Sequence, residues 1–189
     1  MAPMNADSPA SETPPSAVAD DALREVAVET ERHVARAGWD QPVRLFALVD
    51  TRDLASRAPD LAPADAPEGA LSAVEQEGFG GPDLQTSLAR IAWPDAVLGC
   101  ALAVERVVVP PEAERDLPED PRAALDALAA HPGRRDVRLL AAVHRDGRHV
   151  CLLRQRAHDD DDMVAVGPTL AAGLVEALGQ SLRADAPDA

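Results

Sequence analysis

Two histidines and a cysteine near residue 150 carry the side chains that zinc accepts as ligands, His144, His149 and Cys151. Between the histidines lies Asp146-Gly147, a pair that two-residue hairpin turns prefer because both central residues need positive φ. Such a turn places His144 opposite His149 and puts Cys151 on the same sheet face. The spacing therefore predicts a zinc site with one position open for water, or an ordinary pair of exposed polar residues beside a hairpin tip.

The four consecutive aspartates in "RQRAHDDDDMVAVGP" are a second group of possible ligands. Alternate residues of an extended chain point to the same side, so Asp159 with Asp161, or Asp160 with Asp162, could bind one Mg²⁺ or Ca²⁺. The run lacks the glycine and the glutamate of an EF-hand loop. The alternative is a solvated acidic turn before a helix N-terminus, where negative charge is favoured.

Glu105 and Arg106 interrupt the most apolar stretch of the chain, "AVLGCALAVERVVVPP". A carboxylate held in apolar surroundings has a raised pKa and can act as a general acid or base. The structural alternative is that the strand leaves its covered region at this pair, or that the pair meets opposite charges on adjacent strands.

The composition excludes several classes of function. All eighteen basic residues are arginines, which removes Schiff-base catalysis and the lysine of a phosphate-binding P-loop. The formal net charge of −15 repels a phosphate backbone or an anionic membrane surface, and only four aromatic residues are present for bases to stack on. We therefore expect no nucleic-acid partner, no membrane partner and no cofactor.

The cysteines and the apolar runs indicate a cytoplasmic protein. Cys100 and Cys151 are two single thiols in apolar surroundings, without the spacing of a metal knuckle or the density of a disulfide framework. The longest uncharged apolar stretch, residues 96–104, is far shorter than the ~20 residues of a membrane-spanning helix. The N-terminal residues contain no basic segment followed by an apolar run, so the sequence does not predict a signal peptide.

The pattern of apolar residues predicts one α+β domain over residues 20–184, after a disordered Pro/Ser/Ala-rich leader (1–19) and before a disordered tail (185–189). We expect an antiparallel or mixed sheet of about four strands, packed by long N- and C-terminal helices. The strands are expected at residues 42–50, 97–109, 137–145 and 148–156.

Four helices are expected. The first ends at Ala37 with Gly38 as its C-cap, the second and third begin after Asp83 and Asp120, and the last lies within residues 167–184. The region from Thr51 to Asp83 is rich in Pro, Ala, Gly and Asp. It is interpreted as a pair of short helices, or as a flap at residues 57–83 that could close over a small ligand.

Three blocks of the sequence carry a family resemblance: "ALREVAVETERHVARAGWDQPVRLFALVDT", "LARIAWPDAVLGCALAVERVVVPP" and "LRQRAHDDDD". On these blocks the chain, over about residues 22–183, resembles an uncharacterised family of small acidic actinobacterial proteins of unknown function. The resemblance implies no catalytic or binding residue.

These observations favour a non-enzymatic cytoplasmic interaction module, an adaptor or chaperone-like protein that binds a protein partner through a sheet edge or a helical groove. The alternative is a metal-dependent enzyme, a hydrolase, with zinc at His144, His149 and Cys151 or a hard cation at Asp159 and Asp161.

Overall fold

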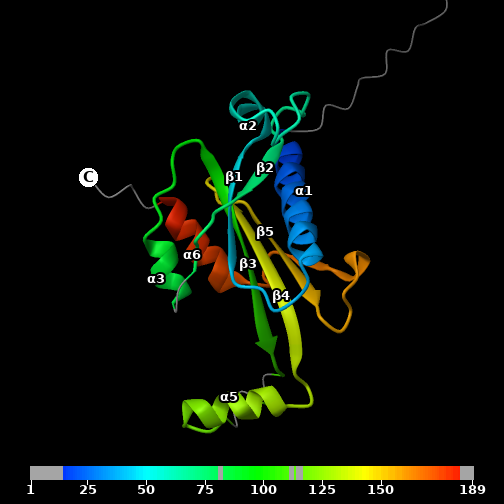
Figure 1. The fold of residues 1–189 in the computed structure, drawn as a ribbon, viewed down its shortest axis with the longest axis vertical. Helices are drawn as coiled ribbons and strands as arrows, with labels where there is room; N and C mark the ends of the chain where they lie inside the picture. Colours follow the sequence, from blue (N-terminus) through cyan, green and yellow to red (C-terminus); the bar gives the residue numbers. More distant parts are fainter. Residues whose placement is uncertain (1–14, 81–82, 111–112, 114–116, 184–189) are drawn as a thin grey trace, which may run out of the picture.

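The computed structural model describes residues 15–80, 83–110, 113 and 117–183, which form one antiparallel sheet and five α-helices (Figure 1). The strands are β1 (Arg44–Asp50), β2 (Leu71–Glu75), β3 (Val97–Val108), β4 (Arg135–His144), β5 (His149–Gln155) and β6 (Ala165–Gly167). The helices are α1 (Pro15–Arg36), α2 (Thr51–Arg57), α3 (Leu84–Ala89), α5 (Pro121–Ala130) and α6 (Ala172–Arg183), with a short 3-10 turn η1 (Asp161–Met163).

The sheet has six strands in the order β2-β1-β3-β4-β5-β6, and every neighbouring pair is antiparallel. The α+β class is confirmed, whereas the expected number of strands, about four, is wrong. The two additional strands lie at the edges. β2 falls in the segment interpreted as a flap or two short helices, and β6 has only three residues. Both are short, so neither carries a periodic pattern long enough to recognise.

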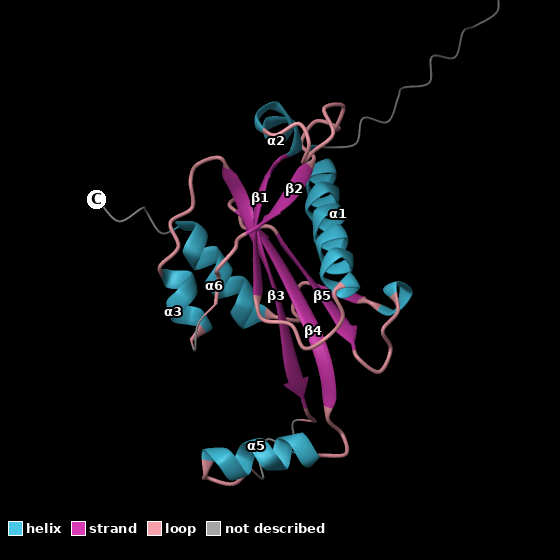
Figure 2. Cartoon of the chain, in the orientation of Figure 1, coloured by secondary structure: helices cyan, strands magenta, loops and turns pink. Residues whose placement is uncertain are grey.

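Helices cover both faces of the sheet, and α1 lies on the opposite face from α6 and α3 (Figure 2). Along β3, Cys100, Leu102 and Val104 contribute to the core beside α6, while Ala101 and Ala103 contribute to the core beneath α1. This alternation explains why the strand is apolar at almost every position. Both of its faces are covered.

Small side chains allow α1 to pack closely on the sheet. Ala101 pairs with Ala142 across β3 and β4, and Ala103 follows on the same face. The helix contributes Ala27, which is fully buried. Its buried Thr30 hydroxyl donates to the Val26 carbonyl oxygen at 2.6 Å, so this hydroxyl has a partner although it is buried.

Helix α5 is placed differently from the others. It lies beyond the ends of β3 and β4, away from both faces of the sheet (Figure 1), and none of its residues is buried. Pro121 occupies its first turn and Asp120 caps its N-terminus, as predicted.

Several helix ends follow the local signals in the sequence. Gly38 has φ of 84° and its N–H donates to the Ala35 carbonyl, as expected of a C-terminal cap. Asp83 accepts hydrogen bonds from the N–H groups of the first turn of α3. The last helix begins later than predicted, at Ala172, because Gly167 pairs with Cys151 and extends the sheet as β6 instead.

The turn between β4 and β5 differs from the predicted two-residue turn. The Gly147 N–H donates to the His144 carbonyl and the His144 N–H donates to the Arg148 carbonyl, both at 2.9 Å. Gly147 has φ of 94°, whereas Asp146 is outside the left-handed region. This is a three-residue loop, a type I turn followed by a glycine bulge, which is the next most common way to close a hairpin.

The third loop residue shifts the register of the hairpin by one position. Val143 pairs with His149 and Ala141 pairs with Cys151. The expectation that His144, His149 and Cys151 share one face is therefore wrong. His149 and Cys151 belong to the α6 face, and His144 belongs to the α1 face, because side chains alternate between the faces along a strand.

Residues 1–14 of the expected leader and residues 185–189 of the expected tail lie outside the described residues, and α1 begins at Pro15, within the range assigned to the leader. None of the described helices is both long enough and apolar enough to cross a membrane.

Gly99 of β3 lies close against the backbone of β4. A Cβ atom at this position would lie 2.5 Å from the Val143 carbonyl oxygen. We expect Gly99→Ala to lower the free energy of unfolding by ~1–3 kcal/mol, measured by urea titration, because the backbone of β4 has to move. Gly173→Ala is the control. It meets no atom within 4 Å and should be neutral or slightly stabilising. Equal effects of the two changes would contradict the close approach.

Candidate functional site

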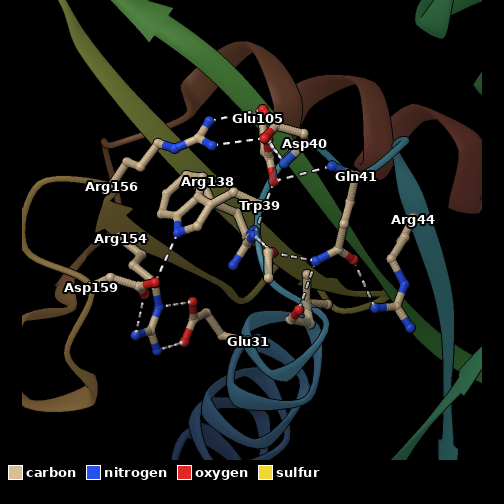
Figure 3. A network of polar contacts seen from close by, with 12 residues as sticks. Glu31, Trp39, Asp40, Gln41, Arg44, Glu105, Arg138, Arg154, Arg156 and Asp159 are labelled. Carbon is tan, nitrogen blue, oxygen red and sulfur yellow. Dashed lines mark hydrogen bonds and ion pairs between the residues drawn. The ribbon is translucent and has the colours of Figure 1, made fainter.

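A buried ion pair joins α1 to β5. The guanidinium of Arg154 donates to both carboxylate oxygens of Glu31, at 2.6 and 2.7 Å, and both side chains are 2% exposed. Figure 3 shows the two groups facing each other in this bidentate arrangement. The geometry supplies two parallel charge-assisted hydrogen bonds, and these bonds raise the pKa of Arg154.

The acidic run contributes two more carboxylates to Arg154. Asp159 accepts a hydrogen bond from Arg154 at 3.1 Å and Asp161 accepts one at 2.6 Å. Alternate aspartates therefore do converge on one cation, but that cation is an arginine. Asp160 instead caps η1 by accepting from the Asp162 N–H at 3.0 Å. Metal binding by Asp159 and Asp161 stays a prediction, and it would have to displace these bonds.

Trp39 links the acidic run to β4. Its indole N–H donates to the second oxygen of Asp159 at 2.9 Å. The guanidinium carbon of Arg138 lies 4.4 Å from the centre of the Trp39 ring, and that of Arg156 lies 5.6 Å from it. Both distances suit cation–π attraction, which strengthens when water is excluded, and Arg138 is only 1% exposed.

Glu105 meets opposite charge on the adjacent strand, so the structural interpretation of this residue is confirmed. It pairs with Arg138 in the β3–β4 register, and its carboxylate accepts from that guanidinium at 2.9 Å. The same carboxylate accepts from the Asp40 N–H at 2.9 Å. Arg138 also donates to the Gly38 carbonyl, at the end of α1, where positive charge is favoured.

Together these side chains form one network at the C-terminal end of α1 (Figure 3). We call it the arginine–carboxylate network, and it consists of Glu31, Trp39, Asp40, Glu105, Arg138, Arg154, Arg156, Asp159 and Asp161. Hydrogen bonds from Arg156 lower the pKa of Asp40, and those from Arg154 lower the pKa of Asp161. Lowered carboxyl pKa values suit ion pairing and oppose general-acid chemistry at pH 7. These two carboxyl groups are therefore held in their charged form beside their arginines.

The predicted zinc ligands do not come together. His144 and Cys151 lie on opposite faces of the hairpin. His144 approaches Asp146, with Nδ1 3.0 Å from a carboxylate oxygen, and His149 is exposed. Cys151 is fully buried, and burial raises the pKa of its thiol. Within the described ranges, no group of three or more His, Cys, Asp or Glu side chains is arranged to hold a metal ion.

The open edge of β2 is a different kind of site. The Gln76 N–H donates to the Leu45 carbonyl and the Thr51 N–H donates to the Ala70 carbonyl, which shows which residues bond to β1. In an antiparallel pair, residues that bond to the neighbouring strand alternate with residues whose main-chain N–H and C=O groups point away from it. Leu71, Ala73 and Glu75 therefore direct their N–H and C=O groups outward, where no described residue bonds to them.

Two hollows lie over the β1–β2 part of the sheet, one on each face. The helix-side hollow, of about 470 Å³, lies between α1 and β2. Its lining includes Val26, Glu29, Thr30, His33, Leu61 and Glu75. The apolar hollow, of about 440 Å³, lies on the opposite face. Its lining includes Ala47, Val49, Val74, Phe79, Ile91 and Trp93.

The sequence model of the family described as PPA1309-like protein matches residues 23–183. The chain belongs to this family. The matched range contains every residue of the arginine–carboxylate network and both hollows, and the description states no activity, substrate or partner. The match supports the resemblance to an uncharacterised family that was inferred over residues 22–183. The actinobacterial origin stays a prediction. No curated protein and no solved structure matches the chain.

The sequence did contain signals for the residues that were missed. Glu31 lies four residues after Ala27 and three before Val34, both buried, so it falls on the apolar face of α1. Arg138 and Arg154 interrupt the apolar runs of two adjacent strands. In the observed register they lie directly opposite each other, which requires acidic partners nearby. β2 offered no comparable signal.

The ion pair of Glu31 with Arg154 can be tested by removing one charge. We expect Glu31→Gln to lower the free energy of unfolding by ~3–5 kcal/mol in urea titrations, because a buried guanidinium loses its principal partner. Glu29→Gln removes the same charge from an exposed position of α1 and should change the stability by less than about 0.5 kcal/mol. Similar losses for the two variants would mean that burial of the pair is not what matters.

The lowered pKa of Asp161 predicts a pH dependence. Its contribution to stability is fully present above its ordinary pKa of 3.8 and is lost as the pH falls through its lower folded-state pKa. The stability difference between the wild type and Asp161→Asn should therefore stay constant from pH 7 to about pH 5 and shrink as the pH falls below 3.8, as followed by urea unfolding. Asp162→Asn is the control, since among the described residues that carboxylate contacts no arginine. A difference independent of pH would argue against the contact with Arg154.

Proposed function

We propose that this protein is a non-enzymatic cytoplasmic interaction module, of the adaptor or chaperone-like kind, that binds an extended segment of a protein partner along the outer edge of β2. The observation that carries the proposal is the row of outward N–H and C=O groups at Leu71, Ala73 and Glu75. Main-chain hydrogen bonds to such an edge supply affinity in strand-addition complexes, and pockets for alternate side chains supply specificity.

The two edges of the sheet are not equivalent. β6 pairs with β5 through only three residues, whereas β2 pairs with β1 through five and is flanked by a hollow on each face. A short strand with a charged end resists indiscriminate pairing, and Glu75 supplies that charge. These features favour a selected partner at β2.

The alternative of a metal-dependent hydrolase draws no support from the described geometry. Its zinc site requires His144, His149 and Cys151 on one face, and the hairpin register separates them. Its hard-cation site requires carboxylates that are already bonded to Arg154. The residues with lowered carboxyl pKa values are ion-paired or cap helices, which is a structural use of charge.

A photo-crosslinking side chain in place of Leu61, which lines the helix-side hollow and is 69% exposed, should give a discrete adduct in cells that express the protein. Adding Ala73→Pro should abolish that adduct, because proline lacks the outward N–H and leaves the bonds between β1 and β2 intact. Ala73→Val keeps the N–H and should retain the adduct.

The matched control places the same crosslinker at Leu125 of α5, which is 66% exposed and lies far from β2 (Figure 1). This position should not give the same adduct. An adduct from Leu61 that persists with Ala73→Pro, in a variant whose unfolding curve matches the wild type, would contradict binding at the edge.

A further inference from the structure

The segment around β2 has an unusual charge. From residue 58 to residue 89 the chain contains no arginine, lysine or histidine. Its charged residues are Asp60, Asp65, Glu68, Glu75, Glu77 and Asp83. The open edge therefore lies within an acidic stretch of a protein whose net charge is already −15. Such a field attracts cationic partners and repels a second copy of the same chain.

A strand added beside β2 would direct its side chains alternately to the two faces of the sheet. One set would lie beside Leu71, Ala73 and Glu75, on the face of α1, and would enter the helix-side hollow. The other set would lie beside Ser72 and Val74 and would enter the apolar hollow. The two hollows would thus receive the side chains of alternate residues of one partner segment.

The helix-side hollow is suited to cationic side chains. Among the described residues, no hydrogen bond or ion pair engages the carboxylate of Glu29. Glu75 lies across the hollow and accepts two hydrogen bonds from Arg44, at 2.5 and 2.6 Å, so it is already paired. The His33 ring accepts a third hydrogen bond from Arg44, because arginine has no acceptor. Among the described residues that line this hollow, Glu29 is therefore the carboxylate with no bound cation.

The apolar hollow is suited to aliphatic side chains. Phe79 and Trp93 are two of the four aromatic residues in the chain, and both line it. Val49 and Val74 form its floor on the sheet, and Glu77 is the one charged residue in its lining. A cationic side chain would lose its hydration here, whereas valine or leucine would gain by burial.

We propose that the partner segment at β2 is a basic strand in which cationic and aliphatic residues alternate, with the cations over Glu29 and the aliphatic residues in the apolar hollow. This inference rests on the proposed function and names the chemistry of its partner. The five residues of β2 require a partner segment of about five to seven residues.

The probe is a capped seven-residue peptide, Lys-Val-Lys-Val-Lys-Val-Lys, added to isotope-labelled full-length protein. Amide hydrogen exchange followed by NMR should show new protection at Leu71, Ala73 and Glu75. The affinity should fall at least ten-fold between about 50 and 500 mM salt, because the attraction is between exposed charges. In antiparallel addition the lysines, which lie opposite Leu71, Ala73 and Glu75, make the main-chain bonds to β2, so a peptide with the same charges whose lysine backbone nitrogens are methylated should bind at least ten-fold more weakly.

Single substitutions separate the hollow from the overall charge. Glu29→Gln should weaken binding about three-fold, as expected for one exposed ion pair. Asp126→Asn removes the same charge from α5, which lies far from β2 (Figure 1), and should leave the affinity within a factor of about 1.5. Equal effects of the two substitutions would overturn the assignment of the cation to Glu29.

The other outcomes of the peptide experiment distinguish a basic partner, an acidic partner, non-specific attraction and a second copy of the chain at the β2 edge. Equal protection by a Glu-Val peptide of the same length would overturn the basic partner while leaving edge binding in place. Binding without protection at Leu71, Ala73 and Glu75 would overturn the proposal as non-specific attraction. Protection at those amides without peptide, rising with protein concentration, would show that a second copy occupies the edge. No binding of any peptide, with the Leu61 crosslink retained, would overturn this inference alone.

Discussion

Two arginines that face each other across β4 and β5 determine how the protein is assembled. Arg138 and Arg154 are directly opposite in the sheet and almost completely buried, which is unfavourable unless acidic groups compensate both charges. Glu105 compensates the first from β3, and Glu31 compensates the second from α1. The order across these residues is therefore acid, base, base, acid. Because Glu31 must reach Arg154, this arrangement also fixes where α1 lies on the sheet.

The position of α1 determines which parts of the sheet are covered. The helix packs over the small side chains of β3 and β4, while α6 covers the same strands on the other face. The middle of the sheet is thereby closed on both sides. β2 is paired along one edge only, and the segments on either side of it provide hollows rather than a tightly packed cover. The rigid interior and the open edge arise from the same arrangement of helices.

Much of the fold could be predicted because its signals are local. The four long strands, the cap at Gly38 and the helix starts at Asp83 and Asp120 each depend on a few neighbouring residues. β2 could not be predicted, since five residues of mixed character become a strand only through pairing with β1. The hairpin was misjudged for a related reason. Asp146-Gly147 fits a two-residue turn and a three-residue loop, and packing of the two faces decides between them.

The sequence by itself determined the α+β class, the acidic character, the absence of lysine chemistry and the positions of the main elements, because composition and periodicity act over short distances along the chain. Only the tertiary structure decided that Asp159 and Asp161 bind Arg154, that His144 is separated from His149 and Cys151, and that β2 is left open. These outcomes depend on which strand lies beside which and in what register. A shift of one residue moves every side chain to the opposite face, so side-chain convergence cannot be deduced from spacing alone.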